Sequence, residues 1–465
     1  MSVLWSAEPA VRTAGPPVGP PVGPPPAADR VRRAAAHWWP LLPLIVTVLL
    51  LAAPLAPQSQ AGSGGLAPAD LASGVLVLFA LVRVVRTRAR PLTPVAAIVL
   101  GIPAVGFAVA TVTAADPQAG LPGLVRYLQV FVLVPAAVVL LLRDARDFRV
   151  VIGCLTALAL VQGAIGIHQY ATGTGASYMG EDIRAVGTFG PTDVMGMATV
   201  VAYGLLAAAA LALRPPAGTP RKVRLLAPAA AGVLIVPLAL SFSRGSWIAT
   251  AVAALAMILL TGLRQAVRAL AVLTAVGVVL VGGFGVGSEM ISQRLSSITQ
   301  VTAAPDRSVT DRYTMWDAAT SMWREQPAAG VGLKGFPAHR DGHASIGLSS
   351  GSDTAGAGHA FQKQPLLSPH NMYLLVLSEQ GLIGLTAFVG SWAAVLAGGV
   401  RRLVHARRVR TAAADCGLAA VGLMLWQTVD FLYADIGGPS TVLTGVVLGL
   451  AAWWALAARD EKTPA

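Results

Sequence analysis

Long apolar runs alternate with short polar connections along most of the 465-residue chain. About twelve of these runs have the length that a helix needs to cross the hydrocarbon layer of a membrane. They lie near 38–56, 69–85, 94–113, 122–142, 149–170, 190–213, 225–241, 246–262, 268–286, 375–399, 412–432 and 439–457. The pattern predicts an all-α, polytopic integral membrane protein with about twelve transmembrane helices.

Composition agrees with a membrane protein and excludes several other classes. Hydrophobic residues make up 55% of the chain and charged residues 12%, and the mean hydropathy is +0.66. The net charge of +12 comes largely from Lys and Arg in short connections, which is a topology signal and not a nucleic-acid-binding patch. Both cysteines, Cys154 and Cys416, fall within apolar runs, so no disulfide framework is expected.

The distribution of basic residues predicts the orientation of the chain. Alternate connections, near 83–90, 143–149, 214–224, 264–268 and 401–410, carry the Lys and Arg residues, whereas those near 57–68, 114–121 and 433–438 carry none. Because cytoplasmic loops are the positively charged ones, both termini are expected in the cytoplasm. The protein would be a multi-pass protein of the cytoplasmic (plasma) membrane with its large loop outside.

These patterns divide the chain into five predicted segments. Residues 1–36 form a Pro/Gly-rich cytoplasmic tail that cannot pack a core and is expected to be disordered. Residues 37–286 hold the first nine predicted spans, 287–368 form the extracytoplasmic loop, 369–458 hold the last three spans, and 459–465 form a second cytoplasmic tail.

The large loop is predicted to contain a helix at the membrane interface. Apolar and aromatic positions recur there at helical spacing, namely Val309, Tyr313, Trp316, Thr320 and Trp323. A stripe that contains tryptophan suits a helix that lies in the interface plane. By contrast, residues 341–358 are rich in Gly and Ser, and we expect them to be mobile.

The segment that follows the loop is longer than one crossing requires. Ser368 is a plausible N-cap and Pro369 a good first helical residue, which would place His370 in the first turn. The positive end of the helix dipole would keep the imidazole neutral, as a base must be. The actual crossing is expected to begin after Gly381.

Five polar residues near this face could carry chemistry. Arg244 lies in a tight connection between apolar runs beside Ser243, Arg312 lies on the loop helix, and Arg184 lies in another outer loop. A guanidinium can bind phosphate through two parallel hydrogen bonds, although each arginine could also simply face water or the interface. His370 could be a base or an ordinary histidine at a helix start. Glu379 could pair with an arginine near the membrane.

No metal site is predicted. His339 and His343 have the spacing of a metal-binding pair on a helix, but no carboxylate or cysteine partner is evident nearby in the sequence.

Four motifs occur in a fixed order: Ser-Phe-Ser-Arg244-Gly-Ser-Trp247, Arg312-Tyr-Thr-Met-Trp316, Pro327 with Gly330-Val-Gly332, and His370-Asn371 with Glu379-Gln-Gly381-Leu-Ile-Gly384. Together they resemble the O-antigen ligase and polymerase superfamily of bacterial membrane proteins, from about Ile183 to Leu385. Arg184 is similar to the arginine of a family segment that continues Gly-Thr-Phe and then usually Pro-Asn. This chain departs from that segment at Pro191-Thr192-Asp193.

The resemblance implies a fold similar to GT-C glycosyltransferases and a set of roles. Arginines that match Arg244 and Arg312, with Arg184, would bind the pyrophosphate of an undecaprenyl-linked glycan, and His370 would be catalytic. Ser243, Asn371, Glu379 and Trp316 would support them. The family inverts the anomeric centre and needs neither metal nor cofactor.

The sequence therefore predicts transfer of a glycan from a polyprenyl pyrophosphate to a glycan, lipid or cell-wall acceptor at the outer membrane face, with no nucleic acid involved. Charge stabilisation by arginine and proton removal by His370 would suffice for the chemistry. A repeat-unit polymerase of the same superfamily is one alternative. A transporter or flippase is another, although ionisable residues gather at the outer edge and not at the midplane.

Overall fold

The computed structural model describes residues 38–53, 67–88, 92–178, 184–190, 193–278, 307–346, 348–409, 411, 413–438 and 440–457. It divides the chain into two units, residues 1–40 and 41–465. In the first unit, Trp39 and Pro40 begin a short 3-10 helix, η1 (Trp39–Leu41). The predicted tails, 1–36 and 459–465, lie outside the described residues, as does 279–306.

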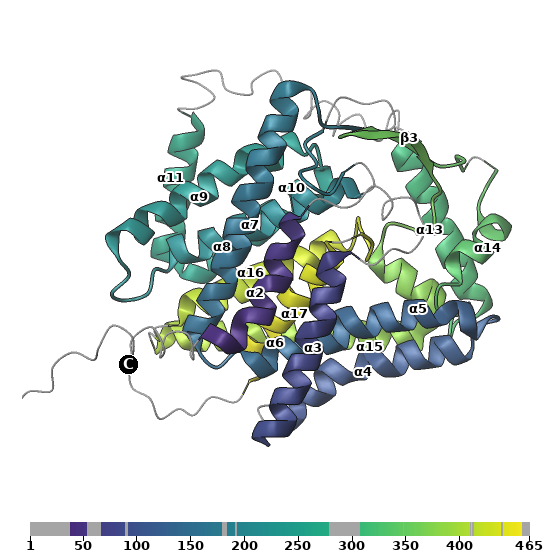
Figure 1. Cartoon of the computed structure of the whole chain (residues 1–465), viewed down its shortest axis with the longest axis horizontal. Helices are drawn as coiled ribbons and strands as arrows, with labels where there is room; N and C mark the ends of the chain where they lie inside the picture. Colours follow the sequence, from purple (N-terminus) through teal and green to yellow (C-terminus); the bar gives the residue numbers. More distant parts are fainter. Residues whose placement is uncertain are drawn as a thin grey trace, which may run out of the picture. The chain divides into compact units, whose positions relative to one another are not determined.

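Helices make up most of the second unit (Figure 1). In chain order they are α2 (Leu42–Leu49), η2 (Leu50–Ala52), α3 (Pro68–Thr87), α4 (Pro94–Val112), α5 (Pro117–Leu128), the π-helical turn η4 (Gln129–Leu133), α6 (Val134–Leu141), α7 (Ala145–Thr172), α8 (Val194–Leu213), α9 (Arg221–Leu240), α10 (Arg244–Thr261), α11 (Leu263–Val278), α13 (Arg307–Glu325), α14 (Phe336–His343), α15 (Met372–Arg408), α16 (Ala414–Asp430) and α17 (Thr441–Leu456).

Eight helical stretches of the described chain are long and apolar enough to cross a membrane. They are Pro68–Thr87, Pro94–Val112, Gly120–Leu141, Ala145–Thr172, Met195–Leu213, Arg221–Leu240, Arg244–Thr261 and Met372–Arg408. Trp39–Ala52 and Thr441–Leu456 are apolar but shorter. The chain is thus a mostly helical, multi-pass membrane protein. The number twelve stays a prediction, since the run expected near 268–286 is described only as far as Val278.

The helices bury one face against each other and leave another apolar face exposed. Among the eight long candidate spans, α8 is the most enclosed, with 72% of its apolar window buried, whereas α3 and α9 bury 28% of theirs. An apolar face of this size is stable only against lipid or another apolar partner. Within the bundle the aromatic rings of Phe131, Phe388, Trp392 and Phe431 pack together, with ring centroids 5.2 to 6.4 Å apart.

α15 is broken at Gly381, as the sequence predicted. The residue has φ 61° and ψ −160°, and a Cβ placed there would lie 2.3 Å from the Ala328 carbonyl oxygen. Only glycine fits this conformation and this close approach. The backbone of 327–332 fills the break: Leu382 N–H donates to Pro327 O at 2.9 Å, and Val331 N–H donates to Ser378 O at 2.9 Å. The segment after α13 is thereby fixed to α15.

A small antiparallel sheet accompanies the helices. Its strands are β1 (Ala176–Tyr178), β2 (Ser352–Gly356) and β3 (His359–Gln364), in the order β1-β2-β3, with Ser177 opposite Ala355. The described part is therefore mostly helical, which fits the predicted all-α membrane protein. The segment 341–358, expected to be mobile, contains the end of α14 and the whole of β2. Its Gly/Ser composition hid a strand that pairs with the distant β1 as well as with the neighbouring β3.

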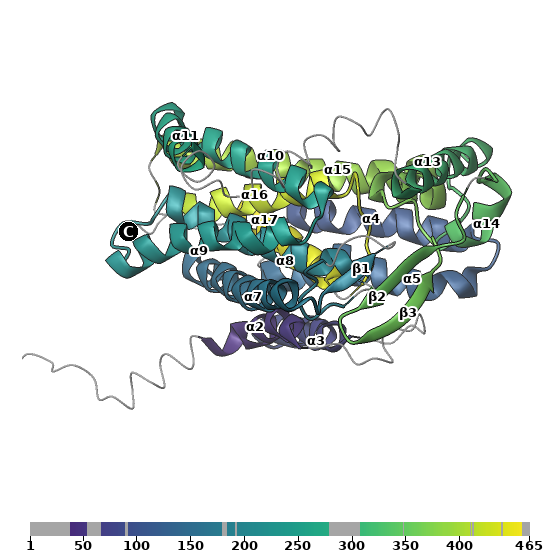
Figure 2. The same cartoon turned by 90° about the horizontal axis from the view of Figure 1, so that it is seen from above.

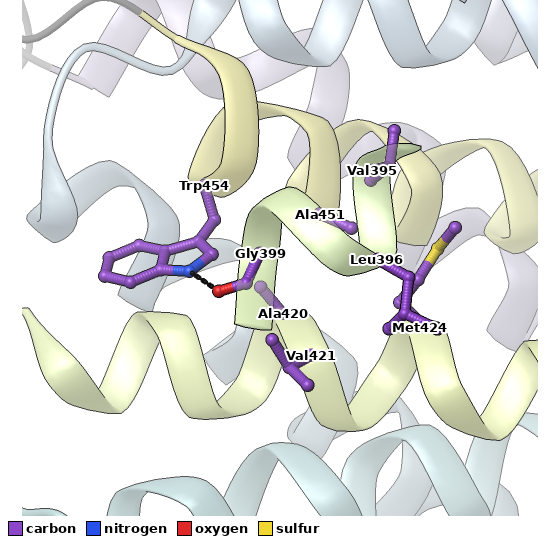
Figure 3. A pocket seen from close by; sticks show the side chains of 8 residues that line it. All are labelled: Val395, Leu396, Gly399, Ala420, Val421, Met424, Ala451 and Trp454. Atoms are coloured by element: carbon purple, nitrogen blue, oxygen red, sulfur yellow. Dashed lines mark hydrogen bonds between the residues drawn. The ribbon is translucent and has the colours of Figure 1, made fainter. Parts of the chain in front are cut away.

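α13 and α14 lie toward one end of this unit and α11 toward the other (Figures 1 and 2). An apolar pocket lies between α15, α16 and α17, on the part of α15 beyond the break (Figure 3). Val395, Leu396, Ala420 and Met424 line it, and the Trp454 indole closes it by donating to Gly399 O at 3.1 Å. Its lining contains no titratable side chain, so it offers no groups for acid–base chemistry.

Candidate active site

α13 positions Arg312. The helix buries Met315, Ala318 and Met322 on one face, and Asp311 fixes its first turn by accepting hydrogen bonds from Ser349 N at 2.9 Å and Ser349 Oγ at 2.6 Å. Arg312 is left partly exposed beside this anchor. The helix itself was predicted from the stripe Val309 to Trp323, and the structure confirms it.

His370 does not lie in the first turn of a helix, so this prediction was wrong. Asn371 is the N-cap of α15, its Oδ1 accepting from Leu374 N at 3.1 Å, and the helix begins at Met372. His370 therefore precedes the cap, in a left-handed conformation with φ 47°. Asn371 provides the cap that we had expected from Ser368. The Trp316 indole contacts the same place, since it donates to Pro369 O at 2.8 Å.

The connection between α16 and α17, residues 431–440, is attached to the start of α15. Met372 N–H donates to Phe431 O at 2.9 Å and to Ala434 O at 3.0 Å, and Asn371 Nδ2 donates to Leu432 O at 3.1 Å. These bonds hold Asp435 close to His370. The site residue Asp435 was missed by the sequence reasoning.

Arg312, His370 and Asp435 form one electrostatic cluster. Burial lowers the pKa of the His370 imidazole, the carboxylate of Asp435 acts to raise it and the charge of Arg312 acts to lower it, leaving a net lowering. A lowered pKa leaves the imidazole neutral, and so able to accept a proton, over a wider pH range. Arg312 is thus close enough for its charge to act on the imidazole of His370.

Arg244 is the first residue of α10. Ser243 caps the helix by accepting from Ser246 N at 3.3 Å, and Phe242 before it is left-handed with φ 51°. The helix start packs on the 431–440 connection, because a Cβ added to Gly245 would lie 3.2 Å from Tyr433 Cβ. Arg244 is thereby brought to the same connection that carries Asp435.

Arg184 lies on the segment next to Arg244. Its backbone N–H donates to Ala176 O at 2.7 Å, which joins it to β1, and Ala185 N–H donates to Leu240 O at 3.1 Å, just before the turn that carries Arg244. Gln169 of α7 holds the loop by accepting from Gly187 N at 2.8 Å. The sheet and this loop place Arg184 at the edge of the candidate site.

Three of the four supporting residues have clear structural contacts. Ser243 and Asn371 are helix caps, and Trp316 holds the peptide before His370. Glu379 is only 1% exposed, and its Oε1 accepts from Phe336 N at 3.2 Å. The expected arginine partner of Glu379 is not found among the described residues, and its Oε2 has no hydrogen-bond partner there.

His339 and His343 contact the backbone one turn earlier, and His343 also contacts an acidic side chain. His339 and His343 each place Nδ1 against a backbone carbonyl one turn earlier, at 2.9 and 2.8 Å, and His343 Nε2 lies 3.1 Å from Glu325 Oε1. Within the described ranges no group of three His, Cys, Asp or Glu side chains has metal-binding geometry.

The signal that could have revealed Asp435 is present in the sequence. Residues 433–438 form a connection that lacks Lys and Arg yet contains an aspartate beside an aromatic residue, Tyr433. An acidic side chain in a short outer connection of a membrane protein is a candidate site residue. We had used this connection only to assign the topology.

Comparison with known proteins finds one family whose model matches part of the chain. Residues 229–389 match the O-antigen ligase family model, a range that contains Arg244, Arg312, Trp316 and His370. No curated protein matches the chain. The matched residues begin within α9, include the whole of α10 and α13, and end within α15, which are the elements that carry most of the candidate site. This part of the chain, from α9 to α15, is therefore similar to the O-antigen ligase family.

Proposed function

We propose that the protein is an inverting glycosyltransferase that moves a glycan from a polyprenyl pyrophosphate, such as undecaprenyl pyrophosphate, to an acceptor hydroxyl. The observation that carries this proposal is the cluster of Arg312, His370 and Asp435, built from elements within and beside the O-antigen ligase match. A cation and a neutral base at one place are what such a transfer requires.

Arginines would bind and stabilise the leaving group. Negative charge grows on the pyrophosphate as the bond between the anomeric carbon and the phosphate oxygen breaks, and preorganised cations reduce the cost of that charge. Arg312 would contact the pyrophosphate directly, with Arg244 and Arg184 on the neighbouring segments. The guanidinium groups would take the place of a divalent cation, so the transfer is proposed to need no metal.

His370 would act as the general base. It would take the proton from the acceptor hydroxyl while the oxygen attacks the anomeric carbon, and the polyprenyl pyrophosphate would leave from the opposite face. One displacement inverts the configuration at that carbon. The carboxylate of Asp435 would stabilise the imidazolium once the proton has been transferred.

The site is proposed to face the outside of the cytoplasmic membrane, with both termini inside, and the twelve-span, GT-C-like scaffold belongs to the same proposal. Basic connections such as 143–149 and 401–410 support this orientation, because such connections lie on the cytoplasmic side. The site residues come from the connections that alternate with them along the chain, and so from the opposite side. The acceptor would be a glycan, a lipid or a cell-wall polymer.

The test is a reconstituted assay that measures release of polyprenyl pyrophosphate and transfer of labelled glycan in the presence of EDTA. Wild type should transfer the glycan, and His370→Ala and Arg312→Ala should lose transfer by roughly a hundredfold or more. Arg324→Ala on the same helix and His168→Ala on α7 remove the same groups at exposed positions, and both should transfer normally.

The outcomes separate the alternatives. Robust transfer by both site variants would remove the catalytic assignment, and loss of wild-type transfer in EDTA that added metal restores would remove metal independence. A ladder of products that contain several repeats would identify a polymerase, whereas a single addition would identify a ligase. Movement of intact lipid across the bilayer with no donor consumed would favour a flippase.

A further inference from the structure

One hydrogen bond joins α13 to the peptide that precedes His370. The Trp316 indole nitrogen donates to Pro369 O at 2.8 Å, and this carbonyl belongs to the peptide unit whose nitrogen is that of His370. Trp316 lies four residues after Arg312, so both project from one side of α13. A single helix therefore contacts the backbone of His370 and presents the arginine that acts on its imidazole.

The backbone of His370 needs such support. A left-handed conformation, here with φ 47°, is disfavoured for any residue with a side chain, and persists only where neighbouring contacts hold it. On the C-terminal side, the cap at Asn371 and the two bonds from Met372 N–H fix the chain. On the N-terminal side, the His370 N–H makes only a long contact with Ser368 Oγ, 3.4 Å, so the Trp316 bond is the main hydrogen bond to a side chain there.

We propose that Trp316 is a positioning residue for His370: its indole N–H holds the Pro369 carbonyl and so keeps His370 in the left-handed conformation beside Arg312 and Asp435. This inference rests on the proposed function for its effect on catalysis. It also means that α13 couples the two parts of the site, because any displacement of Arg312 along the helix also displaces the bond that holds the base.

Trp316→Phe tests the role, and Trp323→Phe is the matched control. Both tryptophans are on α13 and partly buried, but the Trp323 indole nitrogen has no acceptor among the described residues. The two changes thus remove the same atoms, and only the first removes a hydrogen bond. Trp316→His restores a ring N–H at this position and should recover part of any loss.

The first readout does not depend on activity. Carbethoxylation of His370 by diethyl pyrocarbonate, measured by mass spectrometry on the full-length protein across pH, reports both the exposure and the pKa of the imidazole. In Trp316→Phe we expect modification to be faster, by up to about tenfold, on the scale of one lost hydrogen bond. The pKa should rise toward its ordinary value because burial is the main cause of its lowering.

The second readout is glycan transfer. The rate constant in Trp316→Phe should fall by roughly tenfold, with little change in the KM for the donor, whereas Trp323→Phe should match wild type. His370 reactivity and pKa that stay the same in Trp316→Phe would overturn the positioning role. If they change while wild type transfers no glycan, the proposed function fails and the positioning role stands.

Discussion

α10 and α15 begin in the same way but present their functional side chains differently. At α10, left-handed Phe242 is followed by the cap Ser243 and then by Arg244. At α15, left-handed His370 is followed by the cap Asn371 and then by Met372. Arg244 is thus the first residue inside its helix, whereas His370 stands outside and before the cap.

Because of this difference, the backbone of Arg244 is held by its own helix, whereas that of His370 is held by other segments. The helical backbone fixes Arg244, which suits a group that must hold an anion in one place. His370 depends on contacts from other segments, namely Trp316 and the 431–440 connection. We therefore expect changes remote from the chemistry to affect the base more than the arginine.

The largest contrast should come from removing the two side chains. His370→Ala should lower kcat by about 10²–10⁴-fold with a small effect on the KM for the donor, because proton removal is lost and binding is kept. Arg244→Ala should raise this KM as well, since the guanidinium would bind the pyrophosphate in the ground state. Steady-state kinetics with the lipid-linked donor varied, at matched amounts of folded protein, measures both.

An equal rise of the KM for the donor in both variants would show that Arg244 and His370 contribute equally to donor binding. Arg244→Lys separates the charge of the arginine from its geometry. It keeps the charge but loses the forked geometry, so it should recover only part of the activity.

A smaller effect is expected on the pH dependence of transfer when the Asp435 carboxylate near His370 is removed. The proposed mechanism requires neutral His370, so activity should fall as the pH drops through the pKa of that imidazole. The carboxylate of Asp435 acts to raise this pKa. Asp435→Asn should therefore lower it further and move the acidic limb of the pH–rate profile to lower pH.

Asp317→Asn, an exposed aspartate on α13, is the matched control for the pH experiment and should leave the acidic limb unchanged. A shift of that limb to higher pH in Asp435→Asn would contradict the assigned contact.

The smallest effects should come from the caps. Ser243→Ala and Asn371→Ala should each lower the free energy of unfolding by about 1 kcal/mol, the usual cost of losing an N-cap. Asn371→Ala should also reduce transfer, because Asn371 Nδ2 holds Leu432 O. The Ser243 hydroxyl instead contacts Ser246 and Met195.

Chemical unfolding in detergent, combined with the transfer assay, measures both effects. Asn371→Asp keeps an acceptor for the cap but cannot donate to Leu432. It should therefore recover stability and not activity, and full recovery of both would count against the role of this contact.

Much of the fold could be read from the sequence because it depends on local patterns. Apolar runs long enough to cross a membrane predicted most of the helices, the stripe from Val309 to Trp323 predicted α13, and Gly381 predicted the break in α15. Each of these signals lies within one stretch of chain. Arg312 and His370 could be brought together only by resemblance to a family.

The features that were missed depend on contacts between distant segments. β1 pairs with β2 across a large sequence separation, so this strand is not recognisable alone. Asp435 reaches His370 only because 431–440 bonds to the start of α15. The left-handed backbone of His370 is imposed by its neighbours, and a sequence that reads Ser-Pro-His-Asn suggests instead a helix that begins two residues earlier.

The pairing of β1 with β2 also has a consequence for biosynthesis. β1 follows α7, but its partner strand is not made until the ribosome has added α8 to α14, and 431–440 follows later still. An unfinished chain therefore carries Arg184 and Arg244 without the segment that presents the base. If the proposed site is the active one, the protein cannot act on a lipid carrier during its own insertion, and a nascent chain arrested before α16 should be inert.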